Sequence, residues 1–154
     1  MNPTSAAALH AFVTESNAIE GITRPPLDYE VEAHATLLSL PSITVADLEA
    51  FVKDVAAVPL RRQPGQNVCV GAYRPPPGGP NIEYELETLL ADIAAGCTTP
   101  YRAHIRYELL HPFMDGNGRS GRALWAWHKQ RNGHDPFQLP FLQAHYYASL
   151  DAAR

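Results

Sequence analysis

The segment from His111 to Arg122, HPFMDGNGRSGR, brings a histidine, an aspartate, a glycine-rich turn and two arginines together within twelve residues. A histidine side chain ionises near neutral pH and often acts as a general base. Gly116 and Gly118 let the backbone around Asn117 turn so that its N–H groups can face an anion. Asp115 offers the oxygen ligand that Mg²⁺ prefers. We therefore interpret the segment as a phosphate-binding site with a base beside it.

The residues that follow the glycines strengthen this interpretation. Residues 119–131 contain no proline, and their pattern predicts a helix that begins next to the loop. Unpaired N–H groups and the positive end of the dipole make a helix N-terminus favourable for phosphate. Arg119 and Arg122 are three residues apart and so share one helix face, where both guanidinium groups can bind phosphate oxygens.

The whole segment resembles the signature of the Fic family, HxFx(D/E)GNGRxxR, and matches it at every specified position. Members of that family most often transfer AMP from ATP to a protein hydroxyl. The resemblance implies that His111 is the general base, that Asp115 binds Mg²⁺, and that Phe113 packs in the core. It also implies an anion hole and a pair of phosphate ligands, formed by the amides of Gly116, Asn117 and Gly118, the Asn117 side chain, and the guanidinium groups of Arg119 and Arg122.

Gly118 bears on the type of transfer. Family members that phosphorylate their targets carry lysine at this position and bind the nucleotide reversed. The glycine in this chain therefore favours nucleotidyl transfer, with ATP as co-substrate and attack of the target hydroxyl on the α-phosphorus.

A second motif lies close to the N-terminus. Residues 16–21, SNAIEG, match (S/T)xxxE(G/N), the inhibitory motif of many Fic proteins. Ser16 and Glu20 are four residues apart, so on a helix they point the same way. The resemblance implies that Glu20 pairs with Arg122 and denies that guanidinium to the γ-phosphate. The alternative for this hexapeptide alone is an exposed helix end.

The residues of the signature segment are open to three other interpretations: a hairpin turn, a calcium loop and a metal site. DGNG alone is compatible with a hairpin turn. An EF-hand calcium loop requires glutamate at its twelfth position, which counted from Asp115 is Ala126. His104, Glu108 and His111 have the helical spacing of metal ligands on one face, but a metal site there would leave the glycine loop without a purpose.

Two further functions also fit the same residues. In one, the enzyme removes AMP from a target, with Glu20 orienting a water molecule. In the other, the chain is a non-catalytic nucleotide-binding module, against which the presence of His111 and Asp115 argues. The target protein is not identifiable from the sequence; self-modification and oligomer formation are both compatible with it.

The bulk properties indicate one small soluble domain spanning 1–154. The net charge of −4 excludes a basic surface for nucleic acid. Cys69 and Cys97 lack metal-ligand spacing, and no apolar run approaches the ~18 residues of a membrane span. No basic segment precedes the apolar stretch 6–9, so we expect no signal peptide, no membrane association and a cytoplasmic location.

The periodicity predicts a mainly α fold, which the resemblance specifies as a Fic-type helical bundle with a short β-hairpin flap over the active site. Helices are expected at 4–19, 28–40, 44–55, 81–95, 100–110, 119–131 and 139–152, the first forming, with its end, the inhibitory segment 4–21. Residues 65–71 alternate and predict a strand. By resemblance, 61–74 is the flap that docks the target through Val68, Cys69, Val70 and Gly71.

Tyr146 and Tyr147 resemble a tyrosine pair in the last helix of many family members, on the adenine side of the nucleotide. Packing in the core is the equally weighted alternative for both rings.

Overall fold

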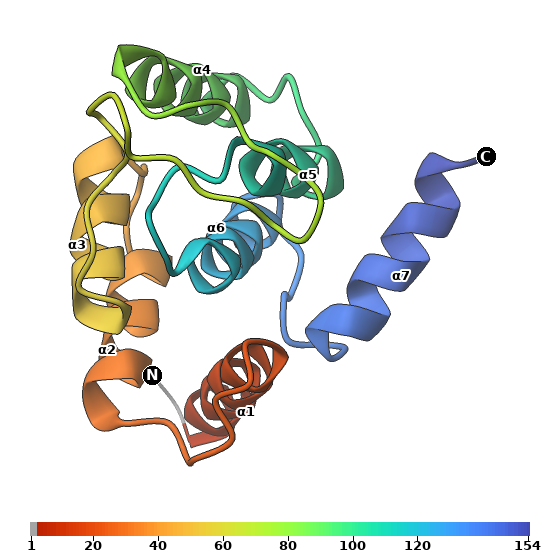
Figure 1. Cartoon of the computed structure of the whole chain (residues 1–154). Coiled ribbons are helices and arrows are strands. Elements are labelled where there is room, and N and C mark those ends of the chain that lie inside the picture. The colour runs from red at the N-terminus through yellow and green to blue at the C-terminus, as the bar shows by residue number, and fades with distance from the viewer. Residues whose placement is uncertain (1–2) are drawn as a thin grey trace.

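The computed structural model describes residues 3–154, and this part of the chain is mainly helical (Figure 1). The mainly α class predicted from the sequence is therefore confirmed. Seven helices follow one another in the described part: α1 (Pro3–Ile19), α2 (Asp28–Leu38), α3 (Val45–Val55), α4 (Pro80–Ala94), α5 (Pro100–Leu110), α6 (Asn117–Arg131) and α7 (Phe141–Ala152).

Helix α6 lies at the centre, with α1, α2, α3 and α5 packed around it (Figure 1). Every residue from Arg119 to His128 is buried, as expected of a helix enclosed on all sides. Trp127 belongs to the main core and donates its indole N–H to the Leu40 carbonyl at 2.8 Å. Trp125 packs instead in a second cluster with Phe12 and Phe141. The two tryptophans thus pack on different neighbours, as their spacing predicts.

Helices α3 and α5 each begin where a threonine side chain caps the helix N-terminus. The Thr44 hydroxyl accepts a hydrogen bond from the Asp47 N–H at 3.3 Å, and the Asp47 carboxylate accepts one from the Thr44 N–H at 2.8 Å. This reciprocal pair satisfies two N–H groups at the start of α3. Helix α5 begins with Thr99 as its cap and Pro100 in its first turn, where the missing N–H is harmless. These starts position the two helices that lead into the signature.

The connection between α3 and α4, residues 56–79, contains no strand, so the predicted β-hairpin is not confirmed. Val70 and Tyr73 exchange two backbone hydrogen bonds of 2.9 Å around a turn at Gly71, whose φ is +58°. The pairing stops there because Val70 is exposed, with no second strand beside it, and the prolines at 75–77 have no N–H to donate. Leu60 forms a separate bridge with Phe113.

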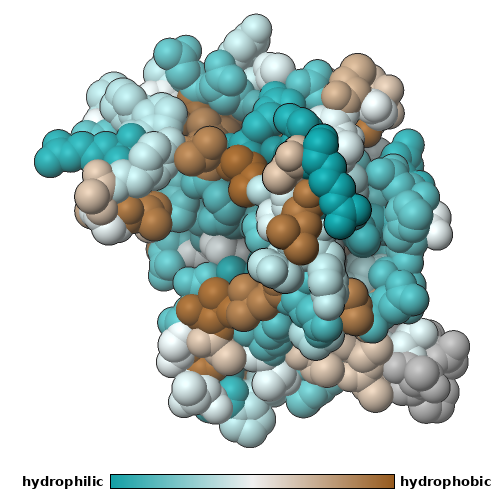
Figure 2. Space-filling view, turned by 90° about the vertical axis from the view of Figure 1, so that its right-hand side faces the viewer, coloured by the Kyte–Doolittle hydropathy of each residue, from teal (hydrophilic) through white to brown (hydrophobic). Residues whose placement is uncertain are grey.

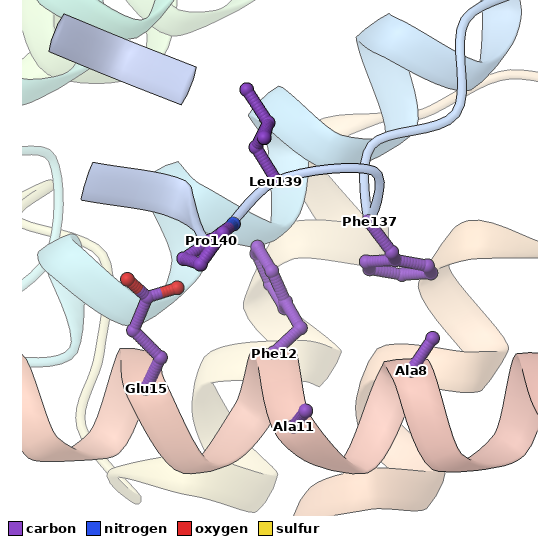
Figure 3. Close-up of a pocket in the computed structure, with 7 residues that line it drawn as sticks. All are labelled: Ala8, Ala11, Phe12, Glu15, Phe137, Leu139 and Pro140. Carbon is purple, nitrogen blue, oxygen red and sulfur yellow. The ribbon is translucent and has the colours of Figure 1, made fainter. Parts of the chain in front are cut away.

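Helix α7 projects from the helices around α6 and buries only Phe141 (Figure 1). Its first two free N–H groups, on Phe141 and Leu142, donate to the Glu15 carboxylate of α1 at 2.6 and 3.2 Å. Figure 3 shows Glu15 beside Phe12 in an apolar pocket of about 350 Å³ between α1 and the segment before α7. On the side that carries α7, apolar side chains lie in small groups among hydrophilic ones (Figure 2).

Along residues 3–154, no helix combines the length and the apolar character that crossing a bilayer requires.

Candidate active site

His111 directly follows α5 and adopts a left-handed backbone conformation, with φ +51° and ψ +62°. Its N–H closes the helix by donating to the Tyr107 carbonyl at 2.9 Å. The following Pro112 disfavours a further helical residue, so the chain must turn at His111. Few non-glycine residues adopt a positive φ, and such a conformation persists only where neighbouring contacts hold it. The histidine is therefore fixed at a sharp bend.

The orientation of the His111 ring defines which of its nitrogens can accept a proton. Nδ1 lies 3.2 Å from the carbonyl oxygen of Glu108. A carbonyl only accepts hydrogen bonds, so Nδ1 carries the proton and Nε2 keeps its lone pair. Burial lowers the pKa of the imidazole, the Glu108 carbonyl opposes this shift, and the Arg61 cation adds to it. The ring is thus favoured in its neutral form, which can accept a proton at Nε2.

The Asn117 side chain closes the signature loop. Its Oδ1 accepts a hydrogen bond from the Phe113 N–H, and its Nδ2 donates to the Phe113 carbonyl, both at 2.8 Å. The side chain is buried, and both of its polar atoms are already paired. The side-chain amide therefore holds the loop closed, and its predicted contact with phosphate stays a prediction. Phe113 is fully buried in the main core, as expected.

The start of α6 leaves backbone N–H groups free for an anion. The helix begins at Asn117, two residues earlier than the sequence pattern predicts, with Gly116 as its cap at φ +76°. Glycine has no side chain to cap the first turn, so residues 3–154 provide no acceptor for the N–H groups of Asn117, Gly118 and Arg119. The Gly116 N–H differs, because it donates to Asp115 Oδ1 at 2.7 Å. The anion-binding position thus lies over the first turn of α6.

Arg122 is buried and joins α6 to the end of α1. Its Nε donates to Ser16 Oγ at 2.7 Å, and its Nη2 donates to the Ser16 carbonyl at 2.9 Å and to Glu20 Oε1 at 2.7 Å. The Phe141 ring covers the same guanidinium, with 6.0 Å between Cζ and the ring centroid. The two sequence motifs, more than a hundred residues apart in the chain, therefore meet at this one side chain.

Glu20 lies against the start of α6. A Cβ added to Gly118 would collide with Glu20 Oε1 and would stand 3.0 Å from Arg122 Nη1. The Glu20 carboxylate therefore occupies space next to the N–H groups at the start of α6, and the absence of a side chain at 118 makes this position available. A negative charge is favourable there for the same reason that a phosphate is.

The Arg119 guanidinium contacts the end of α3 and not the end of α1. Its Nη1 donates to the Val55 carbonyl at the end of α3 at 2.8 Å, while its buried Nε has no partner in residues 3–154. The guanidinium shares α6 with Arg122 but here satisfies a helix C-terminus. Its assignment as a phosphate ligand stays a prediction.

Asp115 is exposed at the start of the loop. Within residues 3–154, no group of three or more histidine, cysteine, aspartate or glutamate side chains could hold a metal ion. The alternative in which His104, Glu108 and His111 form a metal site is therefore wrong: His104 bonds the Gly121 carbonyl through Nδ1 at 3.2 Å. A single carboxylate does fit Mg²⁺ that is held mainly by substrate phosphates and water.

Two residues of the site were missed by sequence reasoning. Glu108 lies beside Arg122, and burial raises the pKa of its carboxyl to about 7, although the Arg122 cation opposes this. Its Oε1 is buried without a hydrogen-bond partner and approaches Gly121, where a Cβ would collide with it. Arg61 is fully buried and bonds the His111 carbonyl at 2.7 Å. The helical spacing of Glu108 from His111 predicted only the metal site excluded above, and no spacing in the sequence links Arg61 to the signature.

The predicted flap and adenine positions are exposed. Cys69, Val70 and Gly71 lie on the surface of the α3–α4 connection, and Val68 is half-buried there. Tyr146 and Tyr147 are 59% and 49% exposed, which excludes packing in the core of this chain. Neither ring makes a hydrogen bond or a ring contact with a signature residue in the described part of the chain, so their adenine role stays a prediction.

Comparison with known proteins agrees with this geometry. The model of the Fic/DOC family matches residues 31–128, well over half of the chain. Over 52 residues the chain is 48% identical to protein adenylyltransferase fic-1 of Caenorhabditis briggsae and, equally, of Caenorhabditis elegans. The aligned part covers 33% of this chain and 10% of each relative, so the chain spans only a tenth of the length of these proteins.

Proposed function

The chain belongs to the Fic/DOC family, and from this premise we propose that it transfers AMP from ATP to a serine, threonine or tyrosine hydroxyl of a target protein. The observation that carries the proposal is a histidine whose Nδ1 faces a carbonyl, which leaves Nε2 to accept a proton, in the loop that leads to a helix start whose N–H groups have no acceptor within residues 3–154. The relatives named protein adenylyltransferase support the same reaction type.

The residues divide the reaction between them. His111 Nε2 takes the proton of the target hydroxyl as its oxygen attacks the α-phosphorus. A new oxygen–phosphorus bond forms, the bond from the α-phosphorus to the bridging oxygen breaks, and pyrophosphate leaves with that electron pair. The N–H groups at the start of α6 stabilise the negative charge on the phosphates. When bound at Asp115, Mg²⁺ would neutralise phosphate charge and orient the leaving group.

We further propose that Glu20 inhibits this transfer. Arg122 cannot bind the γ-phosphate while its Nη2 donates to Glu20 and its Nε to Ser16. ATP then lacks the contact that would orient its α-phosphate in line with the incoming hydroxyl. Release of Glu20 would return the guanidinium to the nucleotide.

One observation favours a second candidate, the removal of AMP from a modified protein. Glu20 Oε1 lies next to Gly118 and the free N–H groups, close enough to interact with the charge of His111. A carboxylate at this place can orient a water molecule for attack on a bound phosphodiester. In this candidate Glu20 is needed for activity, whereas in AMP transfer its loss increases activity.

The test compares wild type, Glu20→Gly and Glu20→Gly/His111→Ala, each incubated with Mg²⁺ and either α-labelled or γ-labelled ATP. AMP transfer predicts protein labelling from the α-position only, stronger in Glu20→Gly and absent in the double variant. Labelling from the γ-position would mean phosphorylation and would contradict the proposal.

A second assay separates transfer from removal. If Glu20→Gly self-labels from α-labelled ATP, the labelled protein, freed of nucleotide, is mixed with unlabelled wild type. Release of labelled AMP by added wild type, but not by unlabelled Glu20→Gly added in its place, would favour AMP removal as an activity of the same site.

A further inference from the structure

Arg61 is a fully buried cation whose hydrogen bonds lead to the base. Its side chain is 0% exposed, and four of its five N–H groups donate to backbone carbonyls. None of these acceptors is a carboxylate, so the burial of this charge is supported by carbonyl dipoles alone. A buried charge without a counter-ion is costly, and this arrangement implies that the contacts serve a specific purpose.

Two of the contacts fix the end of α5. Arg61 Nη2 donates to the Leu110 carbonyl at 2.9 Å, and Nε donates to the His111 carbonyl at 2.7 Å. The last carbonyls of a helix have no partner within the helix, and a cation near them is favoured by the helix dipole. Arg61 thus satisfies the two groups that the left-handed bend at His111 leaves unpaired.

The other two contacts fix the α3–α4 connection. Arg61 Nη1 donates to the Gln66 carbonyl at 3.1 Å and to the Pro76 carbonyl at 2.8 Å. These acceptors flank the turn with the Val70–Tyr73 pair, one before it and one after it. The Tyr73 hydroxyl adds a separate hydrogen bond of 2.8 Å to the Leu109 carbonyl. The connection and the end of α5 are therefore held by one shared side chain.

We propose that Arg61 is a positioning residue that fixes His111 relative to the α3–α4 connection, so that a target segment docked on the connection presents its hydroxyl to His111 Nε2. This inference rests on the proposed transfer of AMP. Arg61 itself touches neither nucleotide nor target. It acts by holding the His111 backbone in its bend and the docking segment at a set distance from it.

The adjacent arginine provides a matched control. Arg62 also makes four hydrogen bonds, but all go to the carboxylates of Glu49 and Glu83 at 2.7 to 3.1 Å, away from His111. Arg61→Met and Arg62→Met therefore remove the same group, with the same number of contacts, one residue apart. Arg61 is fully buried and Arg62 is 36% exposed, so their effects on stability differ and kcat is compared per folded molecule.

The charges around His111 give a readout that does not require turnover. Arg61 disfavours the protonated imidazole, whereas Glu20 and Asp115 favour it. Removing the Arg61 cation should therefore raise the pKa of His111, and removing the Arg62 cation should leave it in place. Titration of the imidazole by NMR in nucleotide-free protein, assigned by comparison with His111→Ala, measures this directly.

The kinetic experiment introduces Arg61→Lys, Arg61→Met and Arg62→Met into the Glu20→Gly protein and measures self-labelling from α-labelled ATP. A base displaced by about 1 Å costs up to about 100-fold in rate, so Arg61→Met should lower kcat by about 10- to 100-fold. The KM for ATP should hold within about twofold, because the phosphates bind at α6. Arg61→Lys, which keeps the charge and part of the bonding, should recover part of kcat, and Arg62→Met should retain it.

Equal kcat in Arg61→Met and Arg62→Met, per folded molecule, would overturn the proposal, as would an unshifted His111 titration in Arg61→Met. If Arg61→Met does not fold, Arg61→Lys decides: a lowered kcat at unchanged KM supports positioning, and an unchanged kcat overturns it. If the Glu20→Gly protein itself never self-labels, the assigned reaction fails, while the titration still tests the link between Arg61 and His111.

Discussion

At the scale of single residues, Gly118 connects the type of reaction with its control. The family resemblance uses this position to separate nucleotidyl transfer from phosphorylation. The structure adds that the missing side chain makes room for the Glu20 carboxylate beside the first turn of α6. The same glycine therefore bears on the type of transfer and leaves space for the carboxylate that we propose as its inhibitor.

This arrangement makes Gly118 and Glu20 energetically coupled. Gly118→Ala should lower the free energy of unfolding of wild type by at most about 1 kcal/mol, because the new methyl group displaces the flexible end of Glu20 from Arg122 while alanine favours the helix more than glycine does. In a Glu20→Gly background the methyl group meets no carboxylate, so the loss should be much smaller. Urea unfolding of the four proteins in a double-mutant cycle measures the difference. Equal losses in both backgrounds would contradict the coupling.

The signature residues could be found from the sequence because they lie in one continuous segment, and a single motif spacing brings His111, the loop and Arg122 together. Ser16 and Glu20 were found because their hexapeptide has its own pattern. Arg61 could not be found, and Glu108 was considered only as a metal ligand, because the contacts that give both residues their place in the site are tertiary. Arg61 meets the carbonyl of a residue fifty positions away, and nothing in the intervening sequence marks that contact.

At the scale of elements, helix ends were predictable where a side chain defines them. Thr44 and Thr99 cap α3 and α5, and both helices begin within a residue of the predicted positions. The start of α6 was missed by two residues, because the N-cap is Gly116, whose left-handed conformation no local pattern specifies. The strand at 65–71 is not confirmed, because its alternating pattern requires a neighbouring strand, and in the described chain this segment forms a single bridge, Val70–Tyr73.

Helix α7 depends on one side chain of another helix for its attachment. Glu15 caps its start, and Phe141 is its only buried residue. Glu15→Ala should leave two N–H groups unsatisfied and remove a favourable charge at the helix start, costing roughly 1–2 kcal/mol of local stability. We expect amide hydrogen exchange in residues 141–152 to accelerate about tenfold or more, since each 1.4 kcal/mol is a factor of ten.

The matched change Glu32→Ala, at an exposed position of α2, should leave exchange in α7 as in wild type. Uniformly faster exchange over the whole chain in Glu15→Ala would mean that the carboxylate supports global folding and does not act as a local attachment. Because Phe141 also covers the Arg122 guanidinium, loosening of α7 should expose Arg122 as well.

At the scale of the whole molecule, the polar groups buried around α6 make stability depend on pH in two opposing ways. Burial lowers the pKa of His34 and of His104 to about 4, against 6.5 for a free histidine. Their neutral forms stabilise the fold fully above the pKa of the unfolded state. This contribution is lost as the pH falls through the pKa of the folded state. Burial raises the pKa of Glu108 to about 7, against 4.5. The contribution of Glu108 to stability is complete below the pKa of the unfolded state. It is lost as the pH rises through the pKa of the folded state.

The Glu108 contribution can be isolated by Glu108→Gln, which keeps the shape of the side chain and cannot ionise. Both proteins share the histidines, so their effect largely cancels in the difference. As the pH rises from about 5 to about 8, the variant should gain roughly 1–2 kcal/mol in free energy of unfolding relative to wild type. The full pKa shift of Glu108 would give a larger gain, but its side chain is 32% exposed and water screens part of the effect. Urea unfolding at four pH values in this range measures the gain.

Glu87→Gln, an exposed change on α4, should show no such trend. A difference between Glu108→Gln and wild type that is constant across the range would mean that Glu108 is ionised in the folded protein throughout, so that burial does not raise its pKa. Because small domains are stable by only about 5–15 kcal/mol, a gain of this size would identify Glu108 as a group whose presence beside Arg122 weakens the fold at neutral pH.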